Sequence, residues 1–345
     1  MSPPTIPLPA PVCRPLPLPL SVLDLATVGD GCTSAQALAE TTTYAQRADE
    51  LGLHRFWVAE HHNMATVAST NPPVLMAHLA ALTRRIKLGS GGVMLPNHAP
   101  LVVAEQFALL EALHPGRIDL GIGRAPGTDG ATAAALRRSP DALGAEDFPQ
   151  HLIDVMGLLG DRRADRGMWN RFVATPVATT SPQILLLGSS GFSAQLAGML
   201  GLPFAFAHHF DMGGTLAAVE LYQHHFEPSA VLERPYTIVS ASVLAAEDEE
   251  RANWLANPGQ LRRYGMRTGR LFPLYRPEDA AGHPELEAAN AMASYRVVGT
   301  AEQVVAGLHE LAATTKADEL MLHTATYGLS DRLRSLELVM AGWNA

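Results

Sequence analysis

Two adjacent histidines offer acid–base chemistry in this sequence. His61 and His62 follow Glu60 directly after the apolar run 55–59, which is typical of a buried β-strand. An imidazole changes its charge near neutral pH, so either ring suits proton transfer to a bound molecule. Adjacent side chains point in different directions, so we expect one ring to face a reaction centre and the other to form a structural hydrogen bond.

A second set of residues suits an anion. Gly188, Ser189 and Ser190 lie between the apolar run 184–187 and an expected helix. Free N–H groups, the positive end of the helix dipole and two hydroxyls favour a phosphate there, although a serine N-cap explains the same residues. Arg124 ends a neighbouring strand and favours the phosphate, because a guanidinium binds such groups well. A surface arginine paired with an acid is the alternative for Arg124.

Two consecutive glycines, Gly91 and Gly92, interrupt an apolar run that begins at Ile86 and ends at Met94. Backbone without side chains lets a flat ligand approach closely, whereas a bulge or a tight bend would need glycine equally. The pair is therefore a candidate platform for a ligand.

The histidines also raise the question of a metal centre. Glu60, His61, His208 and His209 have suitable ligand types. However, the adjacent histidines do not converge from one strand, and the first strand lacks a pair of alternating histidines. We therefore expect no metal ion.

The elements that must position these residues follow a regular order. Eight apolar, strand-like runs alternate with helical patterns, which is typical of a (β/α)8 TIM barrel of the α/β class. The expected strands are 20–25, 55–59, 86–94, 118–122, 184–187, 204–207, 236–245 and 320–324. A doubly wound sheet is the alternative, but the first strand–helix turn lacks the glycine pattern that binds dinucleotides.

Two connections are longer than the rest, so we expect insertions after the fourth and the seventh strand. In the second insertion, glycine and proline recur through 257–293, which predicts an irregular loop that closes over the site. Residues 1–19 are rich in proline and predict an extended arm, with a disordered tail as the alternative. Residues 20–345 are expected to form a single barrel domain.

Composition excludes several classes of function. The chain of 345 residues is 47% hydrophobic and carries a net charge of −9 with no dense Lys/Arg cluster. We therefore expect no nucleic acid and no membrane as a partner. Two cysteines are too few for a disulfide framework, which favours a reducing cytoplasm as the location.

Taken in order, these residues resemble the bacterial luciferase-like monooxygenases, which are flavin-dependent (β/α)8 barrels. The resemblance covers nearly the whole chain, and four segments carry most of it. They are FWVAEHHN, the glycine-rich stretch GSGGVMLPNHAPLVVAEQFALLEALHPGRIDLGIGRAPG, LLGSSGFSAQLAGMLGLPFAFAHHF, and the carboxyl-terminal VVGTAEQV with ADELMLHT and DRLRSLEL.

The resemblance implies a role for each candidate residue. His61 matches the acid–base histidine near the flavin, and Arg124 matches the arginine that holds the flavin phosphate. Gly91 and Gly92 match a pair joined by a cis peptide against the flavin ring. The expected flavin-binding residues are Asp24, Gly91, Gly92, Met94, Arg124, Gly188, Ser189 and Ser190, and the expected substrate pocket contains His62, Phe206 and His208.

The resemblance also implies an activity. Reduced FMN from a separate NAD(P)H:flavin reductase would react with O2 to a flavin C4a-peroxide that oxygenates a small organic substrate. Gly123 stands where luciferase has a reactive cysteine, so the non-luminescent branch is favoured over light emission. A deazaflavin-dependent oxidoreductase and a non-catalytic flavin-binding protein are the alternatives. A homodimer formed through the early helices is expected.

Overall fold

The computed structural model describes residues 18–137, 146–163, 167–210 and 213–345. Almost all of the expected arm 1–19 lies outside these residues. The fold is therefore described from Leu18 onward.

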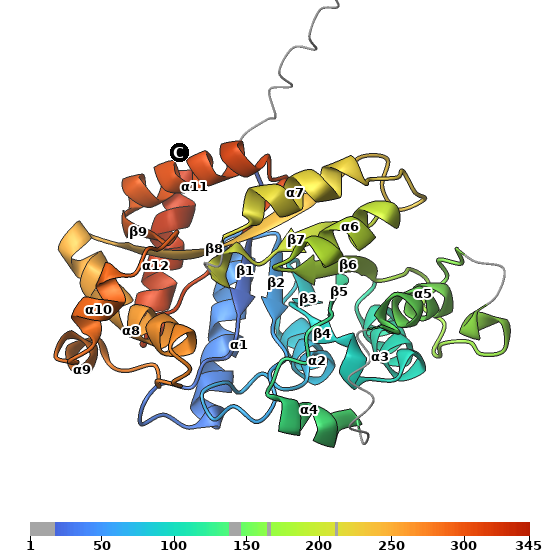
Figure 1. Ribbon diagram of the computed structural model, residues 1–345, viewed down its shortest axis with the longest axis horizontal. Coiled ribbons are helices and arrows are strands. Elements are labelled where there is room, and N and C mark those ends of the chain that lie inside the picture. The colour runs from blue at the N-terminus through green and yellow to red at the C-terminus, as the bar shows by residue number, and fades with distance from the viewer. Residues whose placement is uncertain (1–17, 138–145, 164–166, 211–212) are drawn as a thin grey trace, which may run out of the picture.

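Within the described residues, eight parallel strands close into a barrel, which confirms the predicted fold (Figure 1). Seven of the neighbouring pairs follow chain order, and the last strand pairs with both the first strand and the strand before it, which closes the ring. The barrel strands are β1 (Leu20–Asp24), β2 (Arg55–Val58), β3 (Lys87–Ser90), β5 (Ile118–Gly123), β6 (Gln183–Gly188), β7 (Phe204–Phe206), β8 (Thr237–Ala246) and β10 (Glu319–His323).

Helices surround this barrel on its outside (Figure 1). They are α1 (Ser34–Glu50), α2 (Pro72–Leu82), α3 (Pro100–Leu113), α4 (Gly130–Arg137), α5 (Phe148–Leu158), α6 (Gly191–Met199), α7 (Thr215–His224), α8 (Glu249–Arg267), α9 (Pro277–Ala281), α10 (Leu286–Ala291), α11 (Ala301–Thr315) and α12 (Leu329–Trp343). Short 3-10 turns occur at Leu95–Asn97, Met168–Asn170 and His208–Phe210. Of the helices described, none combines the length and the apolar character that a membrane crossing needs.

Local capping contacts mark the starts of several helices. Thr33 and Gln36 form a reciprocal capping box at α1, and Thr300 and Gln303 form another at α11. Asn71 accepts the N–H of Val74 at the start of α2, with prolines in the first turn. These contacts fix where α1, α2 and α11 begin, and so fix where the loops that precede these helices end.

The third predicted strand is divided. β3 ends at Ser90, and a separate two-residue strand, β4 (Val93–Met94), pairs with β5. Between them, the peptide bond that joins Gly91 to Gly92 is cis. The apolar run 86–94 therefore forms two strands, because the chain turns at the two glycines that interrupt it.

Insertions follow β5 and β8, the fourth and seventh barrel strands, as predicted. The first contains α4 and α5, and α5 packs against α3. The second contains α8, α9, α10 and the added strand β9 (Val297–Thr300), which the sequence analysis missed. β9 pairs with the outer half of β8, beyond the barrel. Figure 1 shows this group on one side of the barrel.

The irregular loop predicted over 257–293 is wrong in its first part. Helix α8 continues through Pro258 to Arg267, because buried Leu255, Ala256 and Leu261 on either side of the proline hold it in place. The approach is close: a Cβ on Gly259 would lie 2.5 Å from the carbonyl oxygen of Ala325. Packing therefore overrides the helix-breaking residues. The closing motion expected of this stretch remains a prediction.

Apolar side chains fill both faces of the barrel wall. Residues that point outward pack against the helices and form the largest core. A smaller cluster lies inside the barrel and consists of Leu23, Trp57, Leu185, Ala205, Ile238 and Met321. This alternation is the two-residue period of a strand, and it leaves the inner cluster as the floor beneath the strands' carboxyl ends.

A buried charge network crosses the interior at the other end of the barrel. Arg55 donates to Glu319 at 2.9 Å and to Asp119 at 2.8 Å, and all three residues are buried. Tyr236 donates to Glu319 at 2.7 Å, and Trp57 Nε1 donates to Asp119 at 3.1 Å. The second Asp119 oxygen, Oδ1, has no partner in the described part of the chain. One guanidinium thus serves two buried carboxylates from β5 and β10.

We expect Arg55→Met to lower the free energy of unfolding by about 3–5 kcal/mol, because it leaves two buried carboxylates without their cation. Urea unfolding followed by circular dichroism measures this loss. The matched control is Arg47→Met on the surface of α1, where the pairs with Glu50 and Glu337 contribute about 1 kcal/mol or less. Equal losses in the two variants would contradict the network's importance.

Candidate functional site

A cavity of about 330 Å³ opens at the carboxyl ends of the barrel strands. We call it the barrel cavity. Its floor includes Leu23, Trp57, Ile238 and Met321 from inside the barrel. The structure brings together at this cavity the following sequence-predicted residues: His61, Gly91, Gly92, Met94, Arg124, Gly188, Ser189, Ser190 and Phe206. The order of the strands therefore brings most of the expected site residues together at one cavity.

The two glycines form part of the cavity wall, and the packing of the barrel requires them. A Cβ on Gly91 would come within 2.7 Å of Leu23 Cδ1, and one on Gly92 within 2.0 Å of Leu187 Cδ1. The bend between β3 and β4 thus needs glycine for reasons internal to the protein. Both glycines line the cavity, so their backbone is available to a ligand.

Beside these glycines, Met94 takes up the space above Gly123. A Cβ on Gly123 would lie 3.0 Å from Met94 Sδ. A larger side chain at position 123, such as a cysteine, would have to displace the thioether. Met94 therefore packs against the position where, by the resemblance, luciferase has a reactive cysteine.

Anion-binding groups gather at the start of α6. Ser190 occupies the N-cap position, but its side chain makes no capping hydrogen bond, so the first N–H groups of the helix are open to another acceptor. The guanidinium carbon of Arg124 lies 4.2 Å from the centroid of the Phe192 ring, which places the charge beside this helix end. Among the described residues, no carboxylate pairs with Arg124.

These observations fit the phosphate of a flavin mononucleotide. Open N–H groups, two serine hydroxyls and one guanidinium converge from the ends of β5 and β6. Ser190 therefore occupies the N-cap position without forming the capping hydrogen bond. Helix dipole, hydroxyls and cation together suit a dianionic phosphate.

His61 lies at the boundary of the cavity with an unsatisfied nitrogen. Its Nδ1 is buried and has no hydrogen-bond partner in the described structure. Burial, with a smaller contribution from the positive charge of Arg262, lowers the pKa of His61 to about 4. The ring is therefore neutral at pH 7, and it has one nitrogen ready to accept or donate a proton toward a bound molecule.

Glu60 holds the neighbouring loops together. It accepts from His62 Nε2 and His98 Nε2, each at 2.8 Å, and from the N–H of Met94 at 3.0 Å. Burial acts to raise the pKa of Glu60, but the hydrogen bonds from His98 and His62 and from Met94 lower it overall. The ligand atoms of Glu60, His62 and His98 lie within 4.8 Å of one another, a spacing that a metal ion also tolerates. In the structure they are joined by hydrogen bonds.

Three predicted site residues lie elsewhere, and their placement corrects the prediction. His62 turns to Glu60 because adjacent side chains diverge. Asp24 points outward from β1, where it accepts from Thr41 at 2.6 Å and pairs with Arg332 at 3.4 Å. These contacts tie the first strand to the surrounding helices, so neither residue lines the barrel cavity.

His208 is the third predicted residue that does not line the barrel cavity, and its neighbour His209 does. His208 bonds Thr215 at 2.7 Å and faces away from the cavity. His209, which sequence reasoning treated only as a metal ligand, lines the cavity and bonds Ser240 Oγ at 2.6 Å. Burial lowers the pKa of His209 well below its ordinary value. No sequence signal separates two adjacent histidines that follow a short strand.

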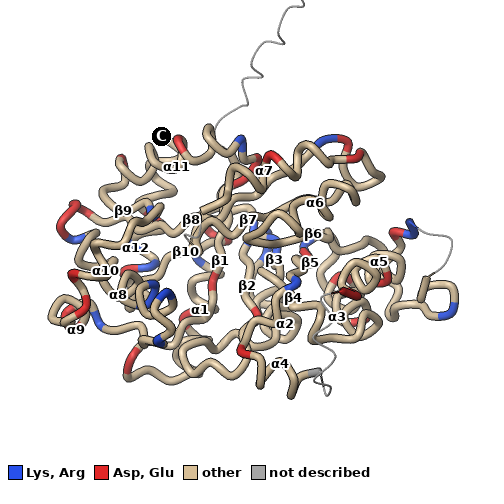
Figure 2. The backbone as a smooth tube through the Cα atoms, viewed as in Figure 1, with Lys and Arg blue, Asp and Glu red and all other residues tan. Residues whose placement is uncertain are grey.

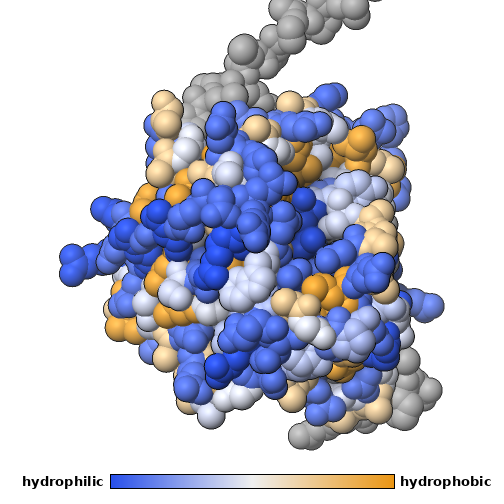
Figure 3. All heavy atoms as spheres, turned by 90° about the vertical axis from the view of Figure 1, so that its left-hand side faces the viewer, coloured by the Kyte–Doolittle hydropathy of each residue, from blue (hydrophilic) through white to orange (hydrophobic). Residues whose placement is uncertain are grey.

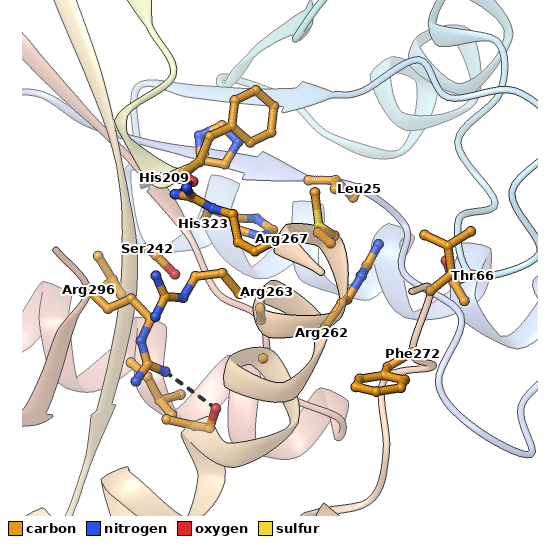
Figure 4. A pocket seen from close by; sticks show the side chains of 18 of the residues that line it. Leu25, Thr66, His209, Ser242, Arg262, Arg263, Arg267, Phe272, Arg296 and His323 are labelled. Atoms are coloured by element: carbon orange, nitrogen blue, oxygen red, sulfur yellow. Dashed lines mark hydrogen bonds between the residues drawn. The ribbon is translucent and has the colours of Figure 1, made fainter. Parts of the chain in front are cut away.

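A second cavity of about 700 Å³ adjoins the first, and helix α8 forms one wall (Figure 4). We call it the α8 cavity. Its lining includes His61, Ser189, His209 and Phe210, which also line the barrel cavity. His323 lies behind His209, with ring centroids 5.3 Å apart. The two cavities therefore meet at His61 and His209.

Comparisons with known proteins agree with this arrangement. The family model described as "Luciferase-like monooxygenase" matches residues 18–318. A luciferase-like monooxygenase of Escherichia coli is 41% identical over 93% of this chain and 95% of its own length. An N-acetyl-S-alkylcysteine monooxygenase of Bacillus subtilis is 34% identical over 93% of this chain and 96% of its own length.

Solved structures share the fold. The crystal structure of apo-MsnO8 is 34% identical with a TM-score of 0.87 and covers 95% of this chain and 98% of its own. Two structures with lower identity show the fold alone: the oxygenating constituent of a 3,6-diketocamphane monooxygenase from Pseudomonas putida in complex with FMN (19%, TM-score 0.70, covering 94% and 97%) and an F420-dependent secondary alcohol dehydrogenase with an F420–acetone adduct (14%, TM-score 0.66, covering 95% and 99%).

The family match spans most of the chain, and the relatives are similar along nearly their full length. The barrel, the cis glycine pair and the cavity at the strands' carboxyl ends are present together. This chain belongs to the luciferase-like monooxygenase family.

Proposed function

We propose that the protein is a monooxygenase that uses reduced FMN and O2 to oxygenate a small organic substrate. The observation that carries this proposal is the barrel cavity, where an open helix end, Ser189, Ser190 and Arg124 suit a phosphate while Gly91 and Gly92 offer a flat wall. A ring against the glycines and a phosphate at α6 would use both features of one cavity. FMN combines these two groups in one molecule.

In this proposal each residue has a distinct task. Arg124 and the start of α6 bind the phosphate, and the backbone of Gly91 and Gly92 supports the ring. The apolar floor, including Leu187 and Met321, excludes water from the reacting atoms. Bound reduced flavin supplies the two electrons that let one atom of O2 enter the substrate and the other leave as water.

His61 would manage a proton beside the ring. Its imidazole is neutral at pH 7, so it accepts a hydrogen bond or a proton at one nitrogen and donates at the other. His209 lies across the same boundary and is a further candidate for this contact. His62 and Glu60 act at a distance, because they hold the loop that carries His61.

Two partners belong to the proposal. A separate NAD(P)H:flavin reductase would supply the reduced flavin, since the first strand–helix turn of this chain lacks the dinucleotide-binding glycine pattern. A homodimer would use α2 and α3, whose outer faces expose Val74 (68%), Leu109 (49%) and Leu113 (60%). Sedimentation velocity at micromolar concentration tests the dimer, and a monomer there would contradict it.

The deazaflavin alternative rests on the same fold. A solved structure with this fold is a secondary alcohol dehydrogenase in complex with an F420–acetone adduct. Gly123, with Met94 packed above it, supports the non-luminescent branch. Direct titration of the protein with FMN and with F420 compares the two cofactors.

We expect Arg124→Gln to weaken FMN binding about tenfold or more, because a charge-assisted contact to phosphate is lost. Riboflavin, which has the same ring and no phosphate, provides the matched control, and its affinity should change less than twofold. Fluorescence titration of both flavins measures the effect. An equal change for FMN and riboflavin would remove Arg124 from the phosphate site.

Turnover tests the proposed function itself. With reduced FMN and ¹⁸O2, we expect one labelled oxygen atom in a product from a panel of thioethers, aldehydes and ketones, measured by mass spectrometry. His61→Gln should keep FMN affinity but lower product at least about tenfold and raise hydrogen peroxide, because proton transfer is uncoupled. Tight flavin binding without labelled product would favour the non-catalytic alternative.

His61 also predicts a pH dependence of stability. Between pH 6.5 and about 4 the unfolded chain binds a proton at His61 that the folded chain does not, so folding stability falls as pH falls through this window. The contribution lost by pH 5, relative to pH 7.5, is about 2 kcal/mol. His61→Gln should therefore lose less stability over this range in urea unfolding, while the exposed His224→Gln should behave as the wild type.

A further inference from the structure

The α8 cavity has a strong excess of positive charge. Arg262, Arg263 and Arg267 extend into it from α8, and Arg296 from the segment before β9 (Figure 4). The described residues that line this cavity include no aspartate and no glutamate. The whole chain carries a net charge of −9, so this concentration of cations is opposite to the average of the molecule. Figure 2 shows the basic segments on and beside α8.

Arg262 lines the α8 cavity and has hydrogen-bond donors left for a ligand. Its Nη1 donates to Thr27 Oγ1 at 3.0 Å, and no carboxylate of the described residues pairs with it. A guanidinium has five N–H donors and stays protonated, so a neutral hydroxyl satisfies only a small part of it. The charge of Arg262 acts on both His61 and His323, which places it close to the boundary between the two cavities.

The neighbouring arginines are held by backbone carbonyls. Arg263 donates to the carbonyl of Ala293 at 2.8 Å, and Arg296 donates to that of Ala256 at 3.4 Å. These contacts hold the two guanidiniums in place beside Arg262. Charge in a cleft with low-dielectric walls focuses the field and raises the local concentration of anions.

Apolar residues complete the cavity. Val243, Leu244 and Ala256 are buried in its wall, and Phe272 lies across from α8. A ligand here would have an apolar body against these residues and a negative group against the arginines. The phosphate of a flavin does not need this second cationic site, because the open start of α6 and Arg124 suit it at the barrel cavity.

We propose that the oxygenated substrate is an organic acid, with a carboxylate or sulfonate bound by Arg262 and an apolar body in the α8 cavity. This inference rests on the proposed function, because it assigns the barrel cavity to the flavin. The reacting atom of the substrate then lies at the boundary formed by His61 and His209. Arg262 is thereby a residue that selects substrates by charge.

Binding of a matched pair of probes tests the proposal. Octanoate and octanamide have the same apolar chain and differ in charge, and isothermal titration calorimetry with the FMN-loaded protein measures both. We expect octanoate to bind at least about tenfold more tightly, with an affinity that falls as salt increases. Arg262→Gln should reduce octanoate affinity about tenfold and change that of octanamide less than twofold.

The control variant lies on the same helix. Arg251→Gln carries the same substitution on the outer side of α8, where Arg251 pairs with Asp331, and it should keep the preference for octanoate. Equal affinities for octanoate and octanamide in the wild-type protein, or no octanoate binding at millimolar concentration, would overturn the proposal without recourse to any variant.

A third titration separates this inference from the proposed function. FMN affinity should be unchanged within twofold in Arg262→Gln. A tenfold loss of FMN affinity would overturn the inference, because the arginines would then serve the flavin phosphate. If the protein bound octanoate through Arg262 but bound no FMN, the proposed function would fail while the anion site remained.

Discussion

The buried pairing of Arg55 with Asp119 and Glu319 is the constraint on which the barrel depends. It joins β2, β5 and β10 across the interior, at the amino-terminal end of the strands. Two carboxylates could not be buried there without a shared cation, because the loss of hydration would be too large. At the opposite end, buried Glu60 joins His62, His98 and the backbone of Met94, and Asp24 pairs with Arg332. These contacts hold the loops and helices around the barrel cavity, whereas the Arg55 network crosses the interior of the barrel.

The carboxyl-terminal end is built on a different principle. Its glycines, uncapped helix start and unsatisfied imidazole leave backbone and side-chain groups open toward the cavities. Figure 3 shows that the surface carrying α8–α10 is largely hydrophilic, with only scattered hydrophobic residues. That face is therefore more polar than the outer faces of α2 and α3, which expose Val74, Leu109 and Leu113.

Much of the fold was predictable because its signals are local. The apolar runs and their order located all eight barrel strands. The errors arose where tertiary contacts decide. Pro258 and Gly259 indicate an end to α8, but their packing against the rest of the chain keeps the helix intact. β9 consists of only four residues and exists because β8 extends beyond the barrel to receive it.

The candidate site was predictable as a set of loops but not as a set of side chains. Residues after β2, β5 and β6 meet because parallel strands end on one side. Which histidine of each adjacent pair faces inward depends on hydrogen bonds to Glu60 and Thr215, and these nearby partners form no recognisable sequence pattern. Arg262 was not among the predicted site residues, because the helix that carries it was expected to end before it.

The pairing of β9 with the outer half of β8 has an evolutionary consequence. β8 contributes its first residues to the barrel, where Ile238 lies beneath the barrel cavity. Its last residues form a separate two-stranded extension with β9. The segment between these strands, which carries the arginine-rich wall, can therefore change in length or sequence while both of its ends remain fixed. The wall of the α8 cavity can thus vary without a change in the strands beneath the barrel cavity.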